Sequence, residues 1–97
     1  MDINFFKKKI EPILVGYSFQ YTSFLDGDFG DLERVEFEGH NKVGTVDFWS
    51  KGWISIDIYD LILDDQRLNL LLGPDEEQLK AIETLVKLLN GIEENGN

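Results

Sequence analysis

The segment VGTVDFWSKGWISIDIYD, residues 43–60, consists of two runs in which apolar and polar side chains alternate around a short turn. Alternation with a period of two is typical of a β-strand that buries one face. The turn between the runs is Ser50-Lys51-Gly52, whose residue types favour a tight reversal of the chain. The segment therefore predicts an antiparallel hairpin whose buried side chains are Val46, Phe48, Ile54, Ile56 and Ile58.

The same alternation extends upstream, over residues 17–22 and residues 34–38. Turn-forming residues separate these runs, at Asp26–Asp31 and at Gly39-His40-Asn41. Downstream, residues 61–73 have two interpretations, because Leu68, Leu70 and Leu72 alternate as in a strand while a short helix also fits. We therefore expect an antiparallel meander of four strands, or of five if residues 61–73 supply another.

A helix is predicted at each end of the chain. Over Asp2–Glu11 and just beyond, apolar residues recur at helical spacing, with Asp2 as the cap and Pro12 at the end; they are Ile3, Phe6, Ile10 and Ile13. The second helix is predicted over Asp75–Asn90, with Pro74 at its first position and Gly91 as its stop. Its apolar face comprises Leu79, Ile82, Leu85, Val86 and Leu89. The predicted fold is a two-layer α+β domain over residues 1–91, followed by a flexible tail at residues 92–97.

One strand register places all the apolar sets on a single face of the meander. It aligns Tyr21, Val35, Val46 and Ile56 in one row, and Phe19, Phe37, Gly44 and Ile58 in the next. A slip of one residue in any hairpin would send an apolar set to the other face. The opposite face then contains the rows Gln20, Glu36, Thr45, Asp57 and Thr22, Arg34, Asp47, Ser55, in which Arg34 and Asp47 form an exposed cross-strand pair.

The last row of that polar face is apolar: Phe24, Leu32, Trp49 and Trp53. An apolar patch on a polar surface is typical of an interaction site, and tryptophan is enriched among residues that dominate binding energy. Two alternatives to an interaction site stay open. Either residues 61–72 or the chain before the first strand cover the patch, or the paired tryptophans simply stabilise their hairpin.

Charge limits the classes of partner. With 9 basic and 19 acidic side chains, the 97-residue chain has a formal net charge of −10. This charge opposes binding to nucleic acid and to anionic membranes, and it favours a basic protein. No cysteine is present, so disulfides and thiolate chemistry are excluded. No apolar run of signal-peptide length follows Lys7–Lys9, and we expect a cytoplasmic protein.

Side chains that would support catalysis or metal binding are not grouped in the sequence. The single histidine, His40, falls in a predicted turn where we expect it to be solvated. The acidic turn Asp26–Asp31 departs from a calcium loop, because the fifth, sixth and twelfth places hold Gly30, Asp31 and Phe37. We therefore expect no enzyme activity, no cofactor and no metal.

The hairpin Trp49–Asp60 and the segment Leu71–Glu77, within this layout of helix, meander and helix, resemble small acidic bacterial immunity proteins. These belong to contact-dependent growth inhibition and related polymorphic toxin systems. The resemblance implies a cytoplasmic protein that binds and neutralises a cognate toxin domain, often a basic nuclease. Because those families diverge widely, no binding residue is transferred by position.

The residues themselves supply the candidate partner-binding surface. Trp49 and Trp53 are its expected anchors, and the surrounding residues are Glu36, Asp47, Asp57, Tyr59 and Asp60. The alternative is a structural or regulatory homodimer formed through the Trp49/Trp53 face without a toxin partner. A small-ligand carrier is a third hypothesis, although no polar groups converge on a pocket in the sequence. We expect a monomer or a weak homodimer.

Overall fold

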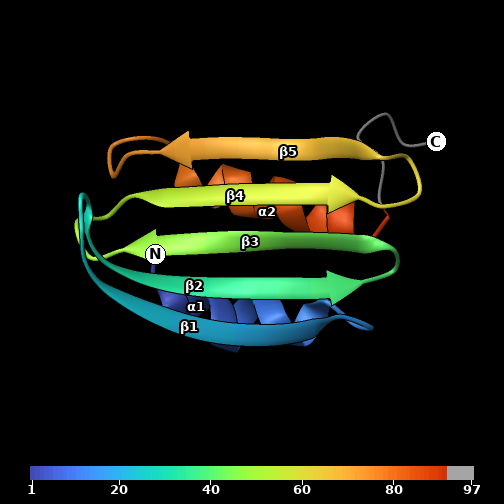
Figure 1. The fold of residues 1–97 in the computed structure, drawn as a ribbon, viewed down its shortest axis with the longest axis horizontal. Helices are drawn as coiled ribbons and strands as arrows, with labels where there is room; N and C mark the ends of the chain where they lie inside the picture. The colour runs from blue at the N-terminus through green and yellow to red at the C-terminus, as the bar shows by residue number, and fades with distance from the viewer. Residues whose placement is uncertain (92–97) are drawn as a thin grey trace.

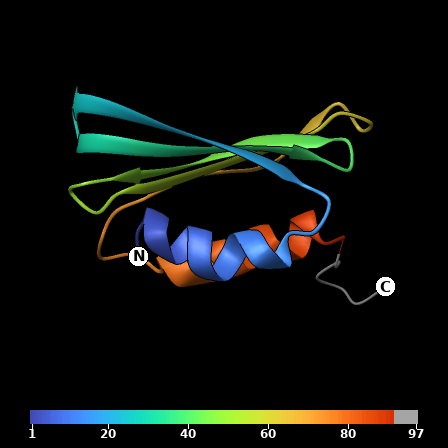
Figure 2. The same ribbon diagram turned by 90° about the horizontal axis from the view of Figure 1, so that it is seen from below.

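Five antiparallel strands form one open sheet in the order β1-β2-β3-β4-β5, and the helical segments lie together on one of its faces (Figure 1, Figure 2). This computed structural model describes residues 1–91, so the predicted tail at residues 92–97 lies outside the described residues. The strands are β1 Ser18–Gly27, β2 Gly30–Gly39, β3 Lys42–Trp49, β4 Ile54–Asp60 and β5 Asp65–Leu72. The α+β prediction is confirmed, and residues 61–73 supply the fifth strand.

The predicted strand register is confirmed. Val35 pairs with Tyr21 on one side and with Val46 on the other, and Val46 pairs with Ile56. The inner face of the sheet is therefore apolar, and it packs on the helices. Leu68, Leu70 and Leu72 of β5 are partly buried against the same core, which explains the alternation in that segment.

Gly44 is required on the inner face by a close approach. A Cβ atom at this position would lie 2.5 Å from Phe37 Cζ and would overlap the backbone oxygen of Asp57. The ring of Phe37, which faces Gly44 across the sheet, occupies the space that a side chain would need. A glycine in a strand therefore marks tight packing here rather than a bend.

The N-terminal helical segment changes its winding along its length. It consists of α1, Ile3–Phe5, then a π-helical turn, Phe6–Ile10, then a 3-10 turn, Glu11–Ile13. Asp2 caps it as predicted, because its Oδ1 accepts the Phe5 N–H at 3.0 Å. Ile13, the last of the apolar residues that recur at helical spacing, is exposed, and Leu14 is buried in its place. A π turn takes more residues than an α turn, so the packed face advances by one residue.

The C-terminal helix α2, Gln78–Leu89, starts three residues later than the sequence predicts. Pro74 is not its first residue, because the preceding residues form a separate turn in which Gly73 donates its N–H to Glu76 Oε1 at 2.8 Å. The Gln78 side-chain amide donates to the carbonyl oxygen of Gly52 at 2.8 Å and ties this end of the helix to the β3–β4 turn. Leu79 is exposed, contrary to expectation, and the buried face consists of Ala81, Ile82, Leu85 and Leu89.

Candidate protein interface

The outer face of the sheet is the face that points away from the helices, and no helix within residues 1–91 covers it (Figure 2). At the end where the β1–β2 and β3–β4 turns meet, it carries a set of apolar residues that we name the apolar band. The band consists of Phe24, Phe29, Leu32, Trp49, Trp53 and Leu71. Phe24 and Leu71 are 45% and 51% exposed, so part of the band is open to solvent.

Phe29, from the β1–β2 turn, packs on both indoles of the band. Its ring stacks on Trp53 at a centroid distance of 4.7 Å and meets Trp49 edge-on at 5.5 Å. The β1–β2 turn is held there by the β3–β4 turn, because the Lys51 N–H donates to the Phe29 carbonyl at 3.2 Å and the Ser50 N–H donates to that of Asp31 at 2.8 Å. The tryptophans are therefore half-buried and fixed in position.

The role of Phe29 is not predicted from the sequence, where this residue lies in an acidic, glycine-containing turn without an expected contact. A useful signal was present, since a lone aromatic residue between Asp28 and Gly30 has no apolar neighbour in its own turn. Only the docking of one turn on another brings it to the indoles.

Asp47 and Arg34 form a bidentate ion pair on the outer face, in the row next to Leu32 and Trp49 of the apolar band. Arg34 Nε donates to Asp47 Oδ1 at 2.8 Å, and Nη2 donates to Oδ2 at 3.1 Å. The expectation of an exposed pair is wrong, since the Asp47 side chain is 7% exposed while that of Arg34 is 36% exposed. The guanidinium also lies 5.3 Å from the centre of the Phe24 ring. These hydrogen bonds raise the pKa of Arg34, and Asp47 contributes no free charge to the surface.

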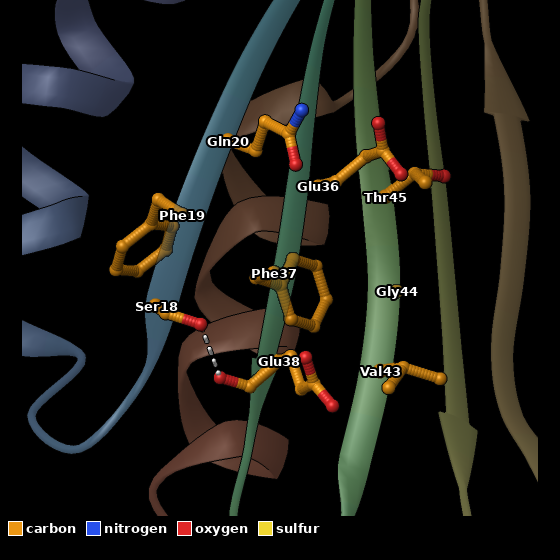
Figure 3. A pocket seen from close by; sticks show the side chains of 9 residues that line it. All are labelled: Ser18, Phe19, Gln20, Glu36, Phe37, Glu38, Val43, Gly44 and Thr45. Carbon is orange, nitrogen blue, oxygen red and sulfur yellow. Dashed lines mark hydrogen bonds between the residues drawn. The ribbon is translucent and has the colours of Figure 1, made fainter.

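Beside the band, towards the opposite end of the strands, the outer face has an open depression of about 620 Å³. Figure 3 shows Gln20, Glu36 and Thr45 side by side across its first three strands, with Ser18, Glu38 and Val43 in the next row. Within residues 1–91 no cation forms an ion pair with Glu36 or Glu38. Asp57, in the neighbouring strand, accepts a hydrogen bond at 2.8 Å from Gln66 Nε2, which is an uncharged donor.

The other two predicted residues, Tyr59 and Asp60, lie at the far end of β4, away from the apolar band. Asp60 is buried, and its Oδ1 accepts the N–H groups of Ile62 and Leu63, both at 3.0 Å. These backbone hydrogen bonds, that of Leu63 first, lower the pKa of Asp60. The Tyr59 hydroxyl donates to Asp64, and that hydrogen bond raises the pKa of Tyr59. Both residues shape the β4–β5 turn.

His40 is a structural contact between two segments. Its Nε2 lies 3.1 Å from the Val15 carbonyl oxygen, its ring packs 5.1 Å from that of Tyr17, and it occupies the space above Gly16. In residues 1–91 no group of three or more His, Asp or Glu side chains is placed to hold a metal ion. None of the helices in that range is both long and apolar enough to cross a membrane.

Comparison with protein-family models, with curated proteins and with solved structures returned no match. The candidate interface is therefore inferred from the residues and their geometry.

Proposed function

We propose that this protein is a non-enzymatic binding domain that neutralises a basic toxin domain by direct contact, as a cytoplasmic immunity protein does. The observation that supports this function best is the outer face, which the helices of residues 1–91 leave open and which joins a preformed aromatic band to an acidic sheet surface. Both features are ones that a basic protein partner would recognise. The resemblance of Trp49–Asp60 and Leu71–Glu77 to immunity proteins of polymorphic toxin systems supports the same function.

The apolar band supplies the anchor of the proposed interface. Tryptophan is prominent among residues whose removal weakens protein complexes most. Because Phe29 already holds the indole of Trp53 in one orientation, little side-chain entropy is lost when a partner covers it. Phe24 and Leu71 extend the surface that would be buried.

The carboxylates of the outer face supply selectivity for the partner. Glu36, Glu38 and Asp57 face outward without an ion-pair partner in the described chain, on a protein whose net charge is −10. Complementary charge accelerates association and rejects acidic partners, and salt weakens both effects. A basic nuclease-type domain fits this surface.

Co-expression with the cognate toxin domain, which under this proposal a neighbouring gene encodes, tests the function. We expect the wild-type chain to restore growth and to co-purify with the toxin domain. The Trp53→Ala variant should raise the dissociation constant about 30-fold, a loss of about 2 kcal/mol. Leu79→Ala, on the exposed side of α2, is the matched control and should bind as the wild type does.

Two results would contradict the proposal. One is the absence of both growth rescue and co-purification with the wild-type chain. The other is a tight homodimer at micromolar concentration that Trp53→Ala dissociates, because the apolar band would then serve self-association.

A further inference from the structure

The β4–β5 turn presents three consecutive aliphatic side chains to solvent, at the opposite end of β4 from the apolar band. Leu61, Ile62 and Leu63 are 52%, 72% and 57% exposed. Turns between strands are normally polar, with Gly, Asn, Asp or Pro where the backbone needs them. None of the three belongs to the buried core or to the apolar residues packed against it.

Four hydrogen bonds hold this turn in place. Asp60 Oδ1 accepts the N–H groups of Ile62 and Leu63, and the Leu61 N–H donates to the Asn41 carbonyl at 2.8 Å. The Tyr59 hydroxyl bridges to Asp64 across the turn. The buried carboxylate of Asp60 therefore fixes the backbone beneath the aliphatic side chains. A preformed apolar projection of this kind loses little entropy on binding.

Charge around the turn decides what covers it. Asp64 and Asp65 are exposed, and the partner of Asp64 is the uncharged Tyr59 hydroxyl. Lys42 and Arg67 are the basic residues whose charge acts on Asp60, at the base of the turn rather than among its exposed carboxylates. A second copy packed turn against turn, with the twofold axis through residues 61–65, would bring these carboxylates close to their own equivalents on two chains of charge −10. An anionic membrane is disfavoured for the same reason. An apolar cleft rimmed by Lys and Arg on a protein complements both the aliphatic and the acidic side chains.

We infer that residues 61–63 form a preformed plug that inserts into an apolar, basic-rimmed cleft of the toxin domain, as a second contact in addition to the apolar band. The inference rests on the proposed function and specifies how the partner is engaged. The seven residues of β4 lie between Trp53 and Leu61, so the two contacts are roughly 25 Å apart at the rise of a β-strand. A partner that touches both must therefore span the long dimension of the sheet. In this arrangement Asp60 is a positioning residue, because it acts through the turn.

The test is a titration of the purified toxin domain against wild-type protein and matched variants. Ile62→Gln should raise the dissociation constant about 10-fold or more, since it removes an apolar contact. Leu79→Gln, a similarly exposed aliphatic residue on α2, should leave affinity unchanged. Asp60→Ala should weaken binding and accelerate amide exchange at residues 62 and 63. Asp60→Asn should keep most of the affinity and most of the protection from exchange, because its amide oxygen still accepts hydrogen bonds.

The outcomes separate this inference from the proposed function. Wild-type affinity for Ile62→Gln, together with weakened binding by Trp53→Ala, overturns the plug and leaves the proposed function standing. Absence of binding by the wild-type chain contradicts the proposed function and overturns the plug with it. Two other results would also overturn the inference by assigning the turn to another occupant. One is self-association in sedimentation that Ile62→Gln abolishes, and the other is flotation with phosphatidylcholine vesicles that the same variant abolishes.

Discussion

Removal of Arg34 should destabilise the protein more than neutralisation of its partner Asp47, although each change breaks the same ion pair. The perturbations are Arg34→Met, which keeps an apolar chain of similar length beside Phe24, and Asp47→Asn, which keeps the shape of the acid. The asymmetry follows from burial, because the Asp47 side chain is 7% exposed and that of Arg34 is 36% exposed. Among the described residues, the side-chain donor that remains for a carboxylate left alone there is the Ser55 hydroxyl, at 3.4 Å.

The magnitude lies between two limits. Removing one partner of a fully buried pair costs about 3–5 kcal/mol, whereas an exposed pair contributes about 0–1 kcal/mol. Because water reaches Arg34, the cost of Arg34→Met is reduced to about 2 kcal/mol. Asp47→Asn leaves a guanidinium that can turn to solvent and should cost about 0.5–1 kcal/mol. The double variant should be about as stable as Arg34→Met or slightly more stable, because the unpaired buried charge is gone.

Urea denaturation, followed by the fluorescence of Trp49 and Trp53, measures the free energy of unfolding of the wild type, the two single variants and the double variant. With a denaturant slope of about 1–2 kcal/mol per molar for a chain of this size, Arg34→Met should lower the midpoint by roughly 1–2 M. Equal costs for the two single variants, or a cost below about 0.5 kcal/mol for Arg34→Met, would show that burial of Asp47 does not control the pair.

Three further changes test other contacts. Phe29→Ala should shift tryptophan emission to longer wavelength and cost about 1 kcal/mol of stability, because the ring stacked on Trp53 is lost; unchanged emission would count against that stack. Burial first, and then the hydrogen bond to Glu11, raise the pKa of Tyr21. Its contribution to stability is thus complete below the ordinary tyrosine value of about 10 and is lost at higher pH, and phenolate absorbance should show Glu11→Gln lowering that pKa. Gly44→Ala should cost about 2 kcal/mol or more in urea denaturation, and wild-type stability would contradict the close approach described for this strand.

The strand register is the part of the fold that the sequence predicts best. Because strand side chains alternate with a period of two, the apolar residues around Val35 and Val46 agree with a single alignment, and the structure has that alignment. The helices are predicted less accurately. Local spacing identifies them, but the π turn that selects Leu14 over Ile13, and the turn that delays α2 to Gln78, depend on how each segment meets the sheet.

The candidate interface divides in the same way. The alternation alone places Trp49 and Trp53 on the outer face with Glu36 and Asp57, because the strand register determines the face of the sheet on which each side chain lies. It does not reveal that Phe29 would stack on the indoles, since that contact joins two turns that are distant in sequence.

The side of the sheet that each residue occupies follows from the amino-acid order alone, because a period of two is a local property of the chain. How much water each of those residues retains depends on the packing of the folded protein. Asp47 and Asp60 are both acidic residues in strands whose sequences alternate between polar and apolar side chains. Asp47 is buried beneath a guanidinium, whereas Asp60 holds the backbone of a turn. Burial depends on neighbours supplied by other segments, and that information is absent from any single stretch of sequence.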